Sequence, residues 1–309
     1  MLILSCSSKL QLAASHPALT PTPSCLWQVY GTVMTINRGN PAAQEVLVDS
    51  WPEFKVILTR PRREVASDDS DLFTNTYTVY YRDLGASRAL LASAGAVNWG
   101  QSFRIFGNLC PKASGRAPQQ LNIYVLSGPN LGSHPTMPAP KLSAPLRLQG
   151  CSQEPCAGLD PAMRLSSLDV SHADLLNETW SFGGNEKSRK YLATLIRHFP
   201  SICLLDSAGH PVSWIASYPF GALGPGYTLH QHRRHGYMGM LNNLLAKRLH
   251  ALGYPSYGYV DVENYPMQRL QEKQGFQRQP NLWYFILHNP ALVKAPTLIP
   301  RPVPGTAPA

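Results

Sequence analysis

Leucines repeat at helical spacing in the carboxyl-terminal half of the chain. They are Leu241, Leu244, Leu245, Leu249 and Leu252. Residues that recur every three or four positions lie on one face of an α-helix, so this face is expected to pack inward. Gly253 follows the last leucine and Pro255 comes two residues later, which is typical of a helix stop. The pattern therefore predicts an amphipathic helix that opens at Gly236.

Strand patterns lie on both sides of this helix. Upstream, Ile202–Asp206 and Val212–Ser217 predict a hairpin, and Tyr227–Leu229 predicts a short strand directly before the helix. Downstream, Tyr257–Val262 alternates apolar and polar residues as a strand does. Gln277–Leu287 is expected to form the last strand.

Three more helices are expected in this half. Ser171 and Asp174 form a candidate capping pair for a helix that runs to about Trp180. Asn185 is expected to cap a second helix that continues through His198. A third follows Asn264 and ends before Gly275-Phe276.

The amino-terminal half also mixes strand and helix patterns. We expect strands at Trp27–Ile36, Phe54–Thr59 and Thr76–Arg82, helices at Ala42–Ser50 and Arg88–Ala94, and a strand or helix end at Gln101–Phe106. Such an order is typical of an α/β domain with three layers.

Proline content divides the chain. Residues 107–161 contain nine prolines and only one strand pattern, at Leu121–Leu126, so this segment is expected to be a Pro-rich linker between two domains. Residues 29–106 form the expected amino-terminal domain and residues 162–289 the carboxyl-terminal domain. Residues 1–28 are expected to be irregular, and residues 290–309 are expected to be a Pro-rich tail.

The predicted helix start at Gly236 suits an anion. A helix that opens from a turn has free backbone N–H groups, here at residues 234–239, at the positive end of its dipole. Arg233, Arg234 and a protonated His235 add positive charge. The simpler alternative is a solvated, charged helix entry.

Arg233-Arg234-His235-Gly236 resembles the pyrophosphate loop of the GNAT superfamily of acyl-CoA N-acyltransferases. The small residue usual two places after the glycine is Met238 here, followed by Gly239, so the match is incomplete. The downstream order of strand, Asn264, helix and Gly275-Phe276 also fits that superfamily.

Longer motifs are similar to the glycine N-acyltransferase family. They include Ile36–Pro41, Asp49–Phe54, Ser167–His172, Phe182–Glu186 and Pro211–Trp214. The resemblance extends from about residue 29 to about residue 288 and is poor over residues 10–28, 107–165 and 290–309. It implies an α/β, two-domain protein whose carboxyl-terminal domain has a GNAT fold, with a mixed, splayed central sheet flanked by helices.

This resemblance implies transfer of an acyl group from acyl-CoA to glycine or a similar small amine, giving an N-acylglycine and CoA. Acyl-CoA would be a co-substrate, and no permanently bound cofactor is expected. A backbone N–H at Leu229 or its neighbours would polarise the thioester oxygen. The expected CoA contacts are Leu229, Arg233, Arg234, His235, Gly236, Tyr237, Met238, Gly239 and Asn264.

Two family positions differ in this chain. Ala222 stands where a glutamate is the expected base, and Gln271 stands where a tyrosine commonly protonates the departing thiolate. The catalytic group is therefore unidentified. His230 and His232 are candidates, because histidine titrates in the right range, or they are partly exposed turn residues. A CoA-binding protein with weak or no turnover is the alternative function.

Two other carboxylates are weighed as bases. Asp261 and Glu263 point to one face of their strand, where they are either bases or solvent-facing charges. No metal site is expected, since no carboxylate or cysteine joins His230, His232 and His235 at ligand spacing.

Composition narrows the partners. The net charge is +9, which could suit nucleic acid, an anionic membrane surface or an acidic ligand. The basic residues occur in short groups, which favours a polyanionic small molecule over nucleic acid. No run approaches the about 20 apolar residues of a transmembrane helix, so none is expected. The six cysteines lack metal spacing and are expected to be reduced thiols. The family resemblance implies a mitochondrial location, and the alternative is cytoplasmic.

Overall fold

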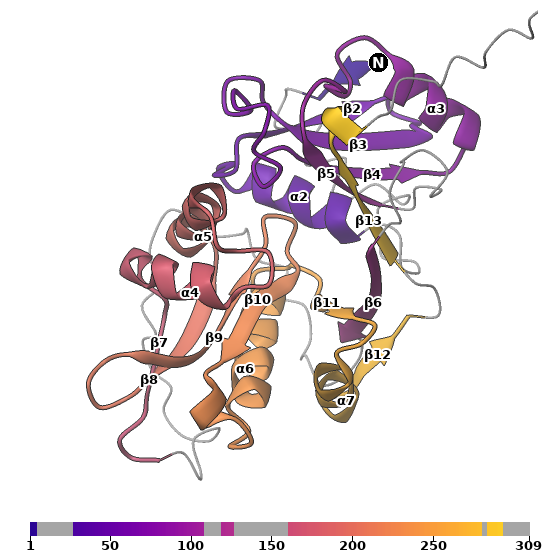
Figure 1. Ribbon diagram of the computed structural model, residues 1–309. Coiled ribbons are helices and arrows are strands. Elements are labelled where there is room, and N and C mark those ends of the chain that lie inside the picture. The colour runs from indigo at the N-terminus through magenta and orange to yellow at the C-terminus, as the bar shows by residue number, and fades with distance from the viewer. Residues whose placement is uncertain (5–26, 108–118, 127–159, 280–282, 293–309) are drawn as a thin grey trace, which may run out of the picture.

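The computed structural model describes residues 1–4, 27–107, 119–126, 160–279 and 283–292 (Figure 1). The described strands form one mixed sheet of 13 strands in the order β1-β2-β3-β4-β5-β13-β6-β11-β10-β9-β8-β7, with β12 paired to β6. The strands are β1 (Leu2–Ile3), β2 (Gln44–Val48), β3 (Val56–Pro61), β4 (Thr76–Tyr81), β5 (Phe103–Gly107), β6 (Gln119–Leu126), β7 (Arg164–Ser166), β8 (Ser201–Leu205), β9 (Pro211–Ser217), β10 (Leu223–Thr228), β11 (Tyr257–Asp261), β12 (Phe276–Arg278) and β13 (Trp283–His288). The predicted α/β class is confirmed.

Helices cover both faces of this sheet. They are α2 (Trp27–Asn37), α3 (Leu84–Ala92), α4 (Ala173–Thr179), α5 (Glu186–His198), α6 (Tyr237–Ala251) and α7 (Tyr265–Lys273), with short 3₁₀ turns at Val170–His172, His230–His232 and Pro290–Leu292. In the carboxyl-terminal half, α4 and α5 pack on the face that carries Trp214, while α6 packs on the face that carries Ile215. Successive strand residues point to opposite faces, so β9 separates the two helical layers.

The prediction of a strand at Trp27–Ile36 is wrong, because this segment forms helix α2. Its valines, threonines and aromatic residues favour a strand by local propensity. In the fold, Val29 and Val33 lie one helical turn apart and pack on Val46 and Val48 of β2. Tertiary burial of this face outweighs the local preference.

The prediction of a helix at Ala42–Ser50 is also wrong, because β2 occupies Gln44–Val48. Its central residues are buried on both faces of the sheet. Val46 and Val48 pack under α2, and Leu47 packs on the opposite face with Val56 and Leu58. A strand buried on both faces is apolar without alternation, so its sequence cannot be distinguished from a helical segment by periodicity.

Other predicted elements agree with the structure. Strands β3, β4 and β5, helix α3, the hairpin of β8 and β9, and strand β11 lie at the expected places. Asn185 caps α5, since its side chain accepts a hydrogen bond from the Ser188 N–H at 2.9 Å. Ser171 was expected to cap the helix before α5, but it does not. Asp169 instead caps the 3₁₀ turn that precedes α4, where its carboxylate accepts a hydrogen bond from the Ser171 N–H. The predicted last strand is divided into β12 and β13.

The two halves share the sheet. Strand β13 is antiparallel to β5 on one side and to β6 on the other, and β6 also pairs with β11 and β12. The predicted strand within the Pro-rich segment is therefore confirmed, and it lies in the middle of the sheet (Figure 1). Most of residues 1–28, of the rest of the linker and of the tail lies outside the described residues.

Helix α2 approaches the carboxyl-terminal half closely at Gly31. A Cβ atom there would lie 1.9 Å from the carbonyl oxygen of Phe220, in the loop before β10. That oxygen belongs to the backbone, so no side-chain rotation can relieve the clash. This contact requires glycine in spite of its cost within a helix.

We expect Gly31→Ala to destabilise the protein by about 1–3 kcal/mol, the usual cost of overpacking. Helix propensity alone would make the alanine variant about 1 kcal/mol more stable than glycine. A net loss of stability would therefore show that the clash with the Phe220 carbonyl dominates. Chemical denaturation measures the difference. Gly100→Ala is the matched control, because a Cβ there meets only the Asn98 side chain at 3.3 Å. Equal stability of both variants would contradict the contact.

Candidate functional site

Two parallel strands part at the centre of the carboxyl-terminal half. β10 and β11 share a single register pair, Leu223 with Gly258, and do not pair beyond it. On its other side β10 stays paired with β9 through Thr228. The open edge of β10 therefore faces the place that β11 leaves. This is the splayed sheet expected of a GNAT fold, which is confirmed by the order of helices and strands around it.

The backbone of β10 presents alternate N–H groups to the open edge. The Leu229 N–H donates to the Val212 carbonyl at 2.9 Å, so it faces β9 and is not the free donor expected from sequence. N–H groups alternate in direction along a strand. Thr228 and Gly226, which are the neighbours one and three residues before Leu229, thus turn their N–H groups toward the open edge.

The first turn of helix α6 lies against β10, since a Cβ built on Gly226 would be 3.4 Å from the Met238 side chain. The helix begins at the predicted residue. Its N-cap is Gly236, with φ 75°, and no side chain caps the helix start among the described residues. Arg234 is also left-handed, with φ 70°. Turns that contain left-handed residues can gather successive N–H groups into a concave anion site. The start of α6 thus has no side-chain cap from the described residues, which is the feature on which the predicted phosphate binding depends.

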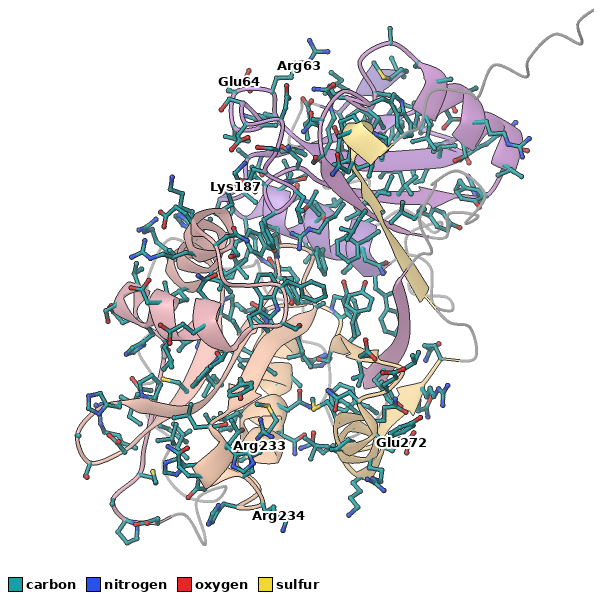
Figure 2. The ribbon with its side chains drawn as sticks, viewed as in Figure 1. Arg63, Glu64, Lys187, Arg233, Arg234 and Glu272 are labelled. Atoms are coloured by element: carbon teal, nitrogen blue, oxygen red, sulfur yellow. The ribbon has the colours of Figure 1, made fainter. Side chains whose placement is uncertain are left out.

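The basic residues of this turn differ in their placement. Arg233 folds back on β10, where it donates to the Thr228 carbonyl and to the Tyr227 hydroxyl, both at 3.2 Å, and stacks on the Tyr227 ring. Arg234 is exposed beside the helix start (Figure 2). His235 is also exposed, and its ring stacks on that of Tyr237. The Arg234 guanidinium and the His235 ring are thus free to contact a ligand, while Arg233 also braces the strand.

The next three residues can contact a ligand mainly through their backbone. The Tyr237 side chain is buried beside Leu204, and Met238 packs toward the core of α6. Gly239 lies against α7: a Cβ there would be 3.2 Å from Leu270, and the Gln274 side chain donates to the Gly239 carbonyl at 2.5 Å. The close packing of α6 on α7 therefore explains why the residue at position 239 is small.

Asn264 is the N-cap of α7. Its side-chain oxygen accepts from the Met267 N–H at 3.3 Å. The expected contact to a cofactor amide therefore depends on the other end of the amide group, its NH₂ donor. This arrangement is compatible with the predicted contact to CoA. It also makes Asn264 the cap of α7, a role that the sequence pattern did not indicate.

Gln271 is buried at the point where β10 and β11 part. Only 1% of its surface is exposed, and its Nε2 lies 3.7 Å from a Cβ built on Gly258. The side chain exchanges hydrogen bonds with Asn242 of α6, which also donates to Gln274 at 2.8 Å. This polar cluster joins α6 to α7. Asn242 was not predicted from the sequence. It is a polar residue on the buried side of α6, next to Leu241.

Ala222 is fully buried in a group of aromatic side chains. Phe106, Phe220 and Tyr257 form its cluster, with Tyr218 and Tyr259 packed against it. The Tyr257 hydroxyl donates to the Phe220 carbonyl at 2.8 Å. Burial raises the pKa of Tyr218, Tyr257 and Tyr259 above the usual value of a phenol. These hydroxyls stay protonated at neutral pH and can donate hydrogen bonds but cannot act as bases.

A cavity of about 210 Å³ lies next to this aromatic group. It is lined by aromatic residues of both halves, among them Phe73, Tyr191 and Phe220, and by threonines such as Thr32 and Thr76. Apolar walls with a few polar groups are typical of small-molecule sites. The cavity lies between α2, β4 and α5. Phe220, which lines it, is two residues before Ala222 in the sequence.

Charged groups of both signs surround this cavity. Asp71 and Lys190 line it, and Arg104 lies behind its wall against the Phe73 and Tyr191 rings. Arg104 is 6% exposed and donates to the Phe73 carbonyl and the Thr76 hydroxyl, both at 3.0 Å, and no carboxylate among the described residues pairs with it. No motif in the sequence indicated this cation.

The remaining sequence candidates lie outside this arrangement. His230 is exposed and His232 partly exposed on the 3₁₀ turn between β10 and α6. The Asp261 carboxylate accepts the Glu263 N–H at 2.8 Å in a local turn. Over the described residues, no group of three or more histidine, cysteine, aspartate or glutamate side chains is placed to hold a metal ion.

Cys203 is the one cysteine among the described residues, and it is a free thiol in the core. Burial raises the pKa of this thiol to about 12, which suppresses nucleophilic character. The other five cysteines lie outside the described residues. Within the part of the chain that the structure describes, no helix has the length and apolar character to cross a membrane.

Comparison with known sequences decides the family. Residues 1–200 match the aralkyl acyl-CoA:amino acid N-acyltransferase family, and residues 202–290 match the carboxyl-terminal region of the same family. The chain belongs to this family. The two matches together cover the residues of both halves of the sheet, including strands β2 and β3 and the open edge of β10.

Individual members of the family are similar over most of their length. Glycine N-acyltransferase-like protein Keg1 from Mus musculus is 35% identical over 269 residues, which is 83% of this chain and 89% of that protein. Glycine N-phenylacetyltransferase and glycine N-acyltransferase from Bos taurus are 33% and 34% identical, each with 83% of this chain and 89% of the relative covered. The family resemblance stated from motifs is confirmed.

The fold of this acyltransferase family member also matches a solved structure. A Drosophila protein solved by X-ray crystallography superposes with a TM-score of 0.66 and 16% identity, covering 94% of this chain and 98% of that one. Since the match covers nearly all of both chains, the two halves and the shared sheet recur together in that protein.

Proposed function

We propose that this protein transfers an acyl group from acyl-CoA to the amino group of glycine or a similarly small amino acid. The observation that carries the proposal is the uncapped start of α6 beside the open edge of β10. Family membership and the transferase names of the relatives support the same reaction. Acyl-CoA is a co-substrate that leaves as CoA.

The diphosphate of CoA would be held at the start of α6. Its negative charge suits the N–H groups at residues 234–239 and the Arg234 guanidinium, and the His235 ring can add a hydrogen bond. From there the pantetheine arm would follow the open edge of β10. The N–H groups of Thr228 and Gly226 would bind its amides or the thioester oxygen, and the Asn264 NH₂ group would donate from the other side.

The reaction joins the amino nitrogen to the thioester carbonyl carbon. As this bond forms, the carbonyl oxygen becomes an oxyanion, which the N–H donors of β10 would stabilise. The carbon–sulfur bond then breaks, the thiolate takes up a proton and the nitrogen loses one. With Ala222 at the expected base position, we propose that glycine reaches the site as the minor, unprotonated amine.

The cavity near Ala222 is the candidate space for the amino acid and the reacting end of the acyl group. A zwitterion suits a site that has both Asp71 and Lys190 in its walls and Arg104 behind them, because opposite charges attract each end. The aromatic walls formed by Phe73 and Phe220 suit an apolar acyl group.

A panel of acyl-CoA donors mixed with amino acids and read by mass spectrometry tests the function. We expect an N-acylglycine to form together with free CoA thiol, with an aromatic or branched acyl donor among the active ones. Thermal stabilisation by CoA with no product from any donor would instead support the alternative of a CoA-binding protein without turnover. Curated relatives named as transferases do not favour that alternative.

The same family resemblance leads us to propose that the protein acts in mitochondria. Imaging of the full chain with a carboxyl-terminal tag, beside a mitochondrial marker, tests this. Diffuse cytoplasmic signal would contradict the proposal.

A further inference from the structure

A second cavity lies in the amino-terminal half, on the side of β3 and β4 that faces α3. Its volume is about 460 Å³. The polar groups in its wall come from Arg60, Arg63, Tyr77, Asn98 and Gln101. None of these residues belongs to the open edge of β10, the start of α6 or the aromatic cavity. The acyl transfer reaction leaves this space unexplained.

Gln101 brings a buried donor to the cavity. The residue is 2% exposed, and its side-chain Nε2 has no hydrogen-bond partner among the described residues. Buried polar groups in folded proteins are nearly always paired, so an unpaired buried donor that lines a cavity needs an acceptor from outside the chain. Water or a ligand can supply it.

The charges in the wall favour an anion. Arg60 is paired with Glu45 at 2.7 Å and donates to the Ala96 carbonyl at 3.1 Å, so its charge is compensated. Arg63 pairs with no carboxylate of the described residues, and its guanidinium lies beside Gly95. One uncompensated positive charge therefore remains at the cavity.

Tyr77 lines the same cavity as Arg60 and Arg63. Burial raises the pKa of its phenol, and the hydrogen bond from the Asn98 N–H and then the positive charges of Arg60 and Arg63 partly oppose this rise. The Tyr77 oxygen accepts the Asn98 N–H at 3.2 Å, which leaves its own O–H as a donor. Guanidinium, side-chain amide N–H₂ and phenol O–H are all donors at this point.

We propose that this cavity is a binding site for a small oxyanion, a phosphate or a carboxylate group, held by Arg63, the Gln101 Nε2 and the Tyr77 hydroxyl. Planar guanidinium matches either group with two parallel hydrogen bonds. The site is separate from the diphosphate site at α6, and Figure 2 shows Arg63 in the opposite part of the molecule from Arg233 and Arg234.

Titration of the full chain with inorganic phosphate, and separately with acetate, tests the site and distinguishes the two oxyanions. Saturating CoA is added in parallel samples to occupy the start of α6. Isothermal calorimetry and the shift in melting temperature are the readouts. We expect one oxyanion to bind and to stabilise the protein in the presence of CoA.

Arg63→Ala is expected to weaken this binding at least tenfold. Arg62→Ala is the matched control, since Arg62 is the adjacent exposed arginine and does not line the cavity. Gln101→Glu, which replaces the donor with a negative charge, should abolish binding. Equal binding by the two arginine variants, or no binding of either oxyanion to the unmodified chain, would overturn the proposal and leave water as the partner of Gln101.

Discussion

CoA is expected to bind at least about tenfold more weakly to Gly236→Pro than to the unmodified protein. Proline has no N–H, so the variant loses one donor to the diphosphate, and a hydrogen bond to a charged group contributes about 1.5–3 kcal/mol. Tenfold in the dissociation constant corresponds to about 1.4 kcal/mol. Proline also fixes φ near −65°, whereas Gly236 has φ 75°, so the turn must change as well. Calorimetry with CoA measures the effect.

Two milder variants separate these causes. Gly236→Ala keeps the N–H and tests the left-handed backbone alone, so its loss of affinity should be smaller. Arg233→Ala should also weaken binding less than the proline, because this side chain is braced against Thr228 and Tyr227. Unchanged CoA affinity in Gly236→Pro and Arg233→Ala, in variants that remain folded, would mean that the pyrophosphate loop is misassigned.

The rate of glycine acylation is expected to rise roughly a hundredfold in Ala222→Glu, the lower end of what a positioned general base contributes. The aromatic surroundings of Ala222 would raise the pKa of the new carboxyl toward neutrality, which suits a base that works near pH 7. The same burial should lower the melting temperature. Steady-state rates with a saturating donor, and a melting curve, measure both effects.

The pH profile provides the control. In the unmodified protein, the rate should rise roughly tenfold per pH unit below the pKa of the glycine amine, because only the unprotonated amine reacts. In Ala222→Glu the profile should level off above the pKa of the introduced carboxyl. Ala222→Gln has a similar shape without a base and should keep the steep profile. A glutamine variant as fast as the glutamate one would contradict the assignment of this position.

The sequence predicted the carboxyl-terminal half well for a physical reason. Helix α6 buries one face and exposes the other, so its leucines repeat with the helical period, and Asn185 is a residue type that caps helices. These signals are local. The order of elements in this half then followed from them. The parting of β10 from β11 was expected only from the family resemblance.

Prediction failed where burial is complete. Helix α2 has buried residues all around, including Gln28, Val29 and Gly31, so its sequence carries no helical stripe and its β-branched residues suggested a strand. Strand β2 is covered on both faces and showed no alternation. In both segments the partner surfaces, which are distant in sequence, decide the local structure.

The family and the helix start at Gly236 were determined by the sequence alone, because short motifs fix backbone turns and residue types directly. The tertiary structure alone decided that Leu229 faces β9, that Asn264 caps α7 and that Gln271 pairs with Asn242. It also decided which residues line the two cavities. Hydrogen-bond direction and cavity shape depend on how strands and helices distant in sequence are packed, and that arrangement leaves no periodic signal along the chain.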